Sequence, residues 1–153
     1  MIELTRVIPL SEKNLSSLEK LVNAFYVEDE EKWYEEYTDF EVYKNLYIPN
    51  KKNIFFVAEN RAENPLGFIM GYERTNEIYA VGINYVLPYE RKRGVAHTLK
   101  DALTREVRYR KYKEIWSDVS VDNVASVTLN FSSGWKPEYL KEWNVYRFKL
   151  KLN

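Results

Sequence analysis

The residues most suggestive of chemistry lie where an extended apolar run gives way to a helix. Three cations, Arg91, Lys92 and Arg93, follow the run, and Gly94 then opens the helix. At a helix start the first backbone N–H groups have no internal acceptors, and the helix dipole adds partial positive charge. Glycine lets an anion reach those groups because it has no side chain. We therefore predict that residues 91–96, called the seam below, bind phosphate.

A solvated basic turn closed by an ordinary glycine is the alternative interpretation of the letters RKRG. The small Ala96 favours the phosphate site, because it also keeps the approach to the helix start open. The flanking residues add a longer pattern, V-x-P-x-x-R-x-x-G-x-A-x-x-L. This pattern is formed by Val86, Pro88, Arg91, Gly94, Ala96 and Leu99.

This pattern resembles the acyl-CoA signature of the GNAT superfamily of N-acetyltransferases, whose core is Arg/Gln-x-x-Gly-x-Gly/Ala. A second stretch, VSVDNVASVTLNFSSGW, is similar to a later motif of the same family. In that motif a strand is followed by Asn, a short helix, and Gly before an aromatic residue, here Asn123, Gly134 and Trp135. The two motifs lie in the order that the family uses.

The resemblance implies that acetyl-CoA is the acyl-donor cosubstrate and that its diphosphate lies on main-chain amides of the seam. The residues assigned to it there are Arg91, Lys92, Arg93, Gly94, Val95 and Ala96. The preceding strand, ending at Val86, would pair with the pantetheine arm, and a main-chain N–H near Val86 would stabilise the oxyanion. Asn123 and Asn130 would lie near the pantetheine or its sulfur; Asn123 is alternatively only a helix N-cap.

The catalytic groups depart from the better-known family pattern. Asn130 stands where many members carry a Tyr that protonates the leaving thiolate, and an amide cannot act as a general acid. Ala80 stands where a catalytic glutamate is often found. Asn84, farther along that strand, is a candidate to hold a water that relays a proton. Glu77 and Asp118 are the nearest carboxylates, each alternatively an exposed charge at a strand end.

The nucleophile implied by the family is a neutral amine, and an apolar wall would lower its pKa and increase its neutral fraction. Tyr34, Tyr37 and Tyr43 are candidates for that wall; plain packing of their helix against the sheet is the alternative. The acidic cluster at residues 28–31 would attract a cationic amine, although acids also suit a helix N-terminus. His97 is expected to be an exposed helix residue rather than a catalytic one.

Composition limits the classes of function. The 153 residues suit a single domain, 1–153, and contain no cysteine, which excludes an acyl-cysteine intermediate and thiolate metal sites. One histidine gives no basis for a His-based zinc site, so no metal is expected. Lys and Arg total 23, as do Asp and Glu, so net charge does not favour nucleic acid or an anionic membrane. No apolar run approaches a membrane span and no signal peptide is evident, which favours a cytoplasmic protein.

The hydrophobic pattern predicts an α/β protein of the α+β type with the element order β-α-α-β-β-β-α-β-α-β-β. It comprises a mixed, mostly antiparallel sheet of about seven strands with four helices, and one strand-helix-strand crossover is built around the seam. The predicted strands lie near 2–8, 53–60, 65–73, 78–86, 114–121, 135–139 and 145–152. The predicted helices lie near 15–25, 33–46, 95–107 and 123–133.

These observations favour an enzyme that acetylates a primary amine of a small molecule or protein by direct attack in a ternary complex. One alternative is a catalytically silent module that binds acyl-CoA and regulates a partner, suggested by the missing Tyr and strand carboxylate. Another is nucleic-acid binding through the basic and aromatic residues 105–113, which zero net charge disfavours. The aromatic tail strands are compatible with a homodimer.

Overall fold

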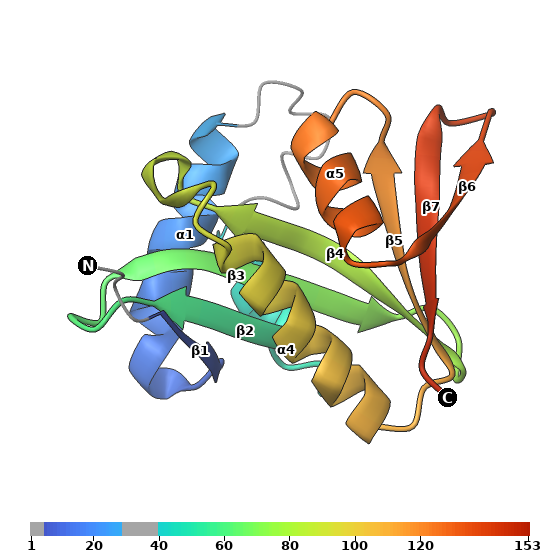
Figure 1. Ribbon diagram of the computed structural model, residues 1–153. Coiled ribbons are helices and arrows are strands. Elements are labelled where there is room, and N and C mark those ends of the chain that lie inside the picture. The colour runs from blue at the N-terminus through green and yellow to red at the C-terminus, as the bar shows by residue number, and fades with distance from the viewer. Residues whose placement is uncertain (1–4, 29–39) are drawn as a thin grey trace.

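The computed structural model describes residues 5–28 and 40–153, and its elements follow the predicted order (Figure 1). The strands are β1 (Arg6–Pro9), β2 (Ile54–Glu59), β3 (Pro65–Glu73), β4 (Ile78–Val86), β5 (Glu114–Ser120), β6 (Lys136–Leu140) and β7 (Val145–Lys151). The helices are α1 (Leu15–Glu28), α3 (Phe40–Val42), α4 (Val95–Tyr109) and α5 (Val124–Ser132). The predicted α/β class, mixed sheet and described helices are therefore confirmed.

The seven strands form one sheet in the order β1-β2-β3-β4-β5-β7-β6. Every neighbouring pair is antiparallel except β4 and β5, which are parallel and are joined through α4. That pairing starts at Ile78 opposite Glu114 and ends at Val81 opposite Ser117. Beyond Val81 the two strands part, as Figure 1 shows, so the second half of β4 has a strand partner only on its β3 side.

Helices cover both faces of the sheet because the central strands are buried on both sides. All six residues of β2 are buried. Ile54 and Phe56 belong to the apolar cluster that includes α4, whereas Phe55 and Val57 belong to the cluster that includes α1 and α3. This alternation is what period-two geometry requires of a strand with two covered faces. In Figure 1, α4 and α5 lie on the near face of the sheet.

A β-bulge bends β4 at the point where it loses β5. Met70 pairs with Ile83 and Gly71 with Val81, so Gly82 is the extra residue. A Cβ at Gly82 would come within 2.9 Å of Met70 Sδ and 3.3 Å of the Met70 carbonyl oxygen, so Met70 would have to shift to admit a larger residue. Because a bulge increases local twist and bends the strand, it directs the end of β4 away from β5 and toward the seam.

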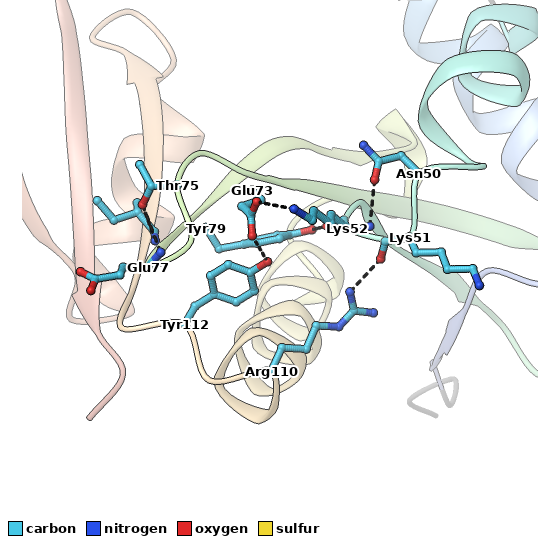
Figure 2. A network of polar contacts seen from close by, with 10 residues as sticks. Asn50, Lys51, Lys52, Glu73, Thr75, Glu77, Tyr79, Arg110 and Tyr112 are labelled. Atoms are coloured by element: carbon cyan, nitrogen blue, oxygen red, sulfur yellow. Dashed lines mark hydrogen bonds and ion pairs between the residues drawn. The ribbon is translucent and has the colours of Figure 1, made fainter.

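Hydrogen bonds fix the other end of the crossover to the turn before β2 and to the end of β3 (Figure 2). The Tyr79 hydroxyl donates to the Lys52 carbonyl at 2.7 Å, and the Tyr112 hydroxyl donates to the Glu73 carboxylate at 2.7 Å. Arg110 donates to the Lys51 carbonyl at 3.0 Å. These bonds tie the C-terminal end of α4 to the edges of β2 and β3. The crossover is thus closed at this end and open at the seam.

The helix predicted near 33–46 is described only from Phe40 onward, where α3 leads into a π-helical turn, Tyr43–Tyr47. Tyr34, Tyr37 and residues 29–31 of the acidic cluster lie outside the described residues. Tyr43 is fully buried and packs edge-on against Phe55 and Phe68. No helix in the described ranges has the length and apolar character to cross a bilayer.

Candidate active site

The seam contains two residues in the left-handed region of backbone conformation. Lys92 and Gly94 both have positive φ, 64° and 83° respectively, on either side of Arg93. The Thr98 N–H donates to the Gly94 carbonyl at 3.0 Å, so the helical hydrogen-bond ladder of α4 begins there. Amides before Thr98 precede the ladder and carry the positive end of the helix dipole. This geometry is suited to an anion.

The Arg91 side chain fastens the seam to neighbouring elements rather than presenting its positive charge to a ligand. Its guanidinium lies 2.7 Å from a Glu28 carboxylate oxygen, and its Nε donates to the Val86 carbonyl at 2.9 Å. The Tyr85 hydroxyl donates to the same carboxylate at 2.6 Å. Burial, together with that carboxylate, raises the pKa of the Tyr85 hydroxyl. The charge of the Arg91 side chain is therefore already paired with Glu28.

The other two cations of the seam face solvent. Arg93 is exposed and lies 3.4 Å from Glu90. Lys92 is exposed as well. Glu28, the described member of the acidic cluster, is engaged by Arg91 at the end of α1. Lys92 therefore remains the best placed of the three cations to meet an anion on the seam.

The second half of β4 presents main-chain groups toward the side that β5 has left. Leu87 N–H donates to the Leu66 carbonyl, so residues 85 and 83 also bond toward β3. In an antiparallel ladder the alternate residues point their N–H and C=O groups the other way. Asn84 and Val86 therefore direct main-chain groups toward the open side. An extended ligand that carries amides matches such an edge.

Asn84 links β4 to the first turn of α4. Its Nδ2 donates to the Ala96 carbonyl at 3.0 Å. Its Oδ1 is buried and accepts no hydrogen bond in the described part of the chain. A buried acceptor without a donor is uncommon and often marks a place where a water or ligand binds. Asn84 thus lies near the seam, as the sequence predicts, and offers an acceptor there.

Sequence reasoning missed a buried lysine next to Asn130. Lys100, on α4, is 3% exposed, and so is Asn130, on α5. Lys100 Nζ lies 2.5 Å from Asn130 Oδ1 and 3.8 Å from the centre of the Trp135 ring. Asn130 Nδ2 donates to the Ser126 carbonyl at 2.8 Å, which fixes the orientation of the amide. Lys100 follows Leu99 on the apolar face of α4. This position was the feature of the sequence from which its burial could have been predicted.

Burial changes the acid–base behaviour of Lys100. It lowers the pKa of the ammonium to about 7, while the charge of Asp101 opposes the change. An amine with that pKa exists in both protonation states near neutral pH, which suits a group that donates or accepts protons. It is unusual for a lysine, whose ordinary pKa lies above 10.

Glu77 does not reach this site. Glu77 precedes β4, on the turn next to Thr75 (Figure 2). Its carboxylate pairs with Lys113 at 3.0 Å, and about half of its side chain is exposed. The nine residues of β4 separate it from the seam by about 30 Å along the strand. Asp118 is also engaged, with Arg147 at 2.8 Å. The structure therefore offers no support for Glu77 as the base.

Two other predicted residues take structural positions. Asn123 is the N-cap of α5, and its Oδ1 accepts from the Ser126 N–H at 3.2 Å. This cap leaves its Nδ2 unused as a donor. His97 is exposed on α4, 3.4 Å from Asp101, as expected of a helix surface residue. In the described ranges, no three His, Cys, Asp or Glu side chains gather as a metal site would require.

A small aromatic pocket lies on the opposite face of β4. Its volume is about 290 Å³, and it is lined by Tyr43, Tyr47, Met70, Tyr72, Gly82 and Ile83. Met70 and Ile83 belong to the α1 side of the sheet, whereas Lys100 belongs to the α4 side. The pocket therefore lies against the bulge on one face of the sheet, whereas α4 and the seam that begins it lie on the other face. A larger pocket, about 380 Å³, lies between β1 and the far end of α4, away from the seam.

Comparisons with known proteins agree with this geometry. Residues 16–129 match the Acetyltransferase (GNAT) family. The PaiA N-acetyltransferase of Thermoplasma acidophilum, solved with coenzyme A, superposes with a TM-score of 0.76 at 16% identity, covering 97% of this chain and 99% of that one. YncA of Salmonella typhimurium, solved with acetyl-CoA, gives 0.81 at 14%, covering 97% and 94%.

A third similar structure is the spermidine/spermine N-acetyltransferase SpeG of Vibrio cholerae. It gives a TM-score of 0.69 at 20% identity, covering 97% of this chain and 95% of that one. At these identities the superpositions show a shared fold. A comparison with curated protein sequences gave no match.

The lowered pKa of Lys100 predicts a pH-dependent stability difference between the wild type and K100M. Between about pH 7 and 10.5 the unfolded chain holds the proton that the folded chain loses, so the lysine destabilises the fold more as pH falls. We expect the stability of K100M relative to wild type to be greater at pH 6 than at pH 9, by roughly 2 kcal/mol. Denaturant unfolding of both proteins at the two pH values measures this; equal differences would contradict the burial effect.

Proposed function

The chain belongs to the GNAT family of acetyltransferases, and on that premise we propose that it transfers an acetyl group from acetyl-CoA to a primary amine of a small molecule or protein. The observation that carries the proposal is the seam: unpaired main-chain amides at the start of α4, beside an open edge of β4. A diphosphate suits the first feature and the amide-bearing pantetheine arm suits the second.

The residues present fit this coenzyme. Amides from Arg91 to Ala96 would hold the diphosphate, and the exposed Lys92 would balance part of its charge. Val86 and Asn84 would pair with the pantetheine arm through the main chain. The buried, unpaired Asn84 Oδ1 supports a polar ligand or water at this point. Asn123 Nδ2 and the Asn130 region of α5 would border the same arm.

The aromatic pocket beside Gly82 is the candidate acceptor site. Its tyrosines and aliphatic side chains would exclude water from an incoming amine. Because desolvation disfavours the ammonium form, the pocket would lower the pKa of the amine and increase the neutral fraction that can attack. Tyr43 lines the pocket and also packs in the core. In this proposal it would serve as one wall of the acceptor site.

Donor and acceptor would meet where β4 has no β5 partner, past Val81. The amine would attack the acetyl carbon directly in a ternary complex, since the chain has no cysteine to carry the acetyl group. A main-chain N–H near Val86 would stabilise the oxyanion. A water held by Asn84 Oδ1 would accept the proton from the amine.

A turnover screen tests the proposed function. We expect release of free coenzyme A from acetyl-CoA with at least one of four amine classes: polyamines, amino acids, aminoglycosides and peptide N-termini. The polyamine arm is motivated by the similarity to SpeG. Calorimetry with coenzyme A accompanies the screen. Tight binding without turnover on any class would contradict the enzyme and favour a silent acyl-CoA-binding module.

Gly94 offers a matched test of the seam. The substitution G94A places a side chain at φ 83°, which strains the backbone, in the path of the diphosphate. Gly134 provides the control, because its φ is 79° and an added Cβ meets no atom within 4 Å at either position. We expect G94A to weaken coenzyme A binding at least about tenfold by calorimetry. Equal affinities of G94A and G134A would contradict the assignment.

A further inference from the structure

We propose that Lys100 donates the proton that the sulfur of coenzyme A takes up as it leaves, and that Asn130 holds the lysine in position for this. The inference rests on the proposed function, because it concerns the same reaction. Lys100 lies outside both the seam and the aromatic pocket, so the proposed function gives it no role. The inference assigns it a catalytic one.

The first argument is that Lys100 lies on the face of α4 that begins at the seam. Ala96 and Lys100 are four residues apart and therefore lie on the same face of α4. Ala96 also receives the hydrogen bond from Asn84, whose main chain lies on the open edge of β4. Lys100 begins about 9 Å along the helix from Gly94. A pantetheine arm that begins at the seam and runs along β4 toward Val81, where β4 and β5 separate, therefore passes this face of α4.

The second argument is the unused hydrogen-bonding capacity of the ammonium. Lysine has three N–H donors, and the described contacts of Nζ are one oxygen, that of Asn130, and the face of Trp135. Asn84, whose Nδ2 bonds the Ala96 carbonyl one helical turn before Lys100, has a buried Oδ1 without a donor. A purely structural polar cluster would satisfy these groups among themselves. Their unused capacity points to a further polar partner between α4, α5 and β4.

The third argument is electrostatic. The groups that contact Lys100 Nζ from other elements are neutral: Asn130 from α5 and Trp135 just before β6. Asp101 is on α4 itself and is shared with His97 at 3.4 Å. With no carboxylate binding it directly, the buried ammonium is stabilised mainly by whatever negative charge arrives. A thiolate is such a charge.

The proposed step balances as follows. The lone pair of the amine forms the N–C bond to the acetyl carbon, and the C–S bond breaks with its electron pair moving to sulfur. Sulfur takes a proton from the Lys100 ammonium, which becomes a neutral amine. The amine nucleophile loses its own proton to the water at Asn84. Lys100 regains a proton from solvent after the products leave, so the net products are the acetamide and the free thiol.

The first test measures the bound thiol without any turnover. Coenzyme A bound to wild type, K100M or K100R is titrated from pH 6 to 10, and thiolate is followed by its ultraviolet absorbance against protein titrated without ligand. A free thiol titrates near about 8.5. Because a thiolate and an ammonium stabilise each other's charged forms, the bound thiolate would also keep Lys100 protonated above the pKa of about 7 that it has without ligand. We therefore expect the bound thiol to ionise at least about one pH unit lower in the wild type than in K100M, with K100R retaining the lower value. Identical titrations would overturn the proposal.

The second test follows catalysis with the best amine found. We expect K100M to lose about 100-fold or more in kcat, with coenzyme A affinity within about threefold of wild type. In the wild type, kcat should fall as the pH rises through the ionisation of Lys100 in the ternary complex, and this limb should be absent from K100M. Loss of affinity and kcat together, with the pH limb retained, would indicate a merely structural role and overturn the proposal.

The absence of cysteine from the chain allows a rescue experiment. K100C is unfolded, alkylated with 2-bromoethylamine to restore an amine at nearly the same length, and refolded; coenzyme A binding verifies the fold. We expect at least about tenfold recovery of kcat over unalkylated K100C. No recovery in a refolded, binding-competent protein would overturn the proposal.

These outcomes separate the two hypotheses. If the wild type binds no coenzyme A, the proposed function and this inference fail together. If it binds the coenzyme but acetylates no amine, the proposed function fails, and the thiol titration still decides whether Lys100 lies beside the sulfur. If turnover is normal and K100M matches the wild type, only the inference about Lys100 fails.

Discussion

The parting of two parallel strands is the constraint on which the rest of the structure depends. β4 and β5 pair only from Ile78 to Val81, and the bulge at Gly82 then turns β4 away. Backbone N–H and C=O groups that lose a strand partner must find another one. The open edge of β4, the amides of the seam and the buried side chains of α4 and α5 all surround this region. The fold thus brings groups with unmet hydrogen bonds together from β4, the seam and α4.

Ion pairing stabilises this arrangement without using the groups whose hydrogen bonds are unmet. Arg91 binds Glu28 and the Val86 carbonyl, so the seam is fastened to α1 and to β4. At the other end of the crossover, the Tyr79 and Tyr112 hydroxyls bind the Lys52 carbonyl and the Glu73 carboxylate. The charge of Arg91 therefore supports the backbone geometry. Lys100 differs, because it is a cation kept where water cannot solvate it.

The fold could be predicted from the sequence because periodicity and the two motifs specify local structure directly. Gly94 and Asn123 lie at helix starts, as their residue types indicate. The proposed catalytic groups could not be predicted in the same way, because they depend on contacts between distant elements. Lys100 and Asn130 are thirty positions apart, and only the packing of α5 on α4 buries them together. Glu77 is not supported as the base, because it lies at the end of β4 away from the seam and pairs with Lys113.

The central claim is that main-chain amides of the seam bind a diphosphate. The most direct measurement is a calorimetric comparison of coenzyme A with pantetheine, which has the same thiol arm but no diphosphate, at one ionic strength and pH. If the seam binds the diphosphate, coenzyme A binds the wild-type protein and pantetheine binds at least about 100-fold more weakly, a difference in binding free energy of about 3 kcal/mol. Equal affinities, or no heat with coenzyme A at millimolar concentration, would contradict it.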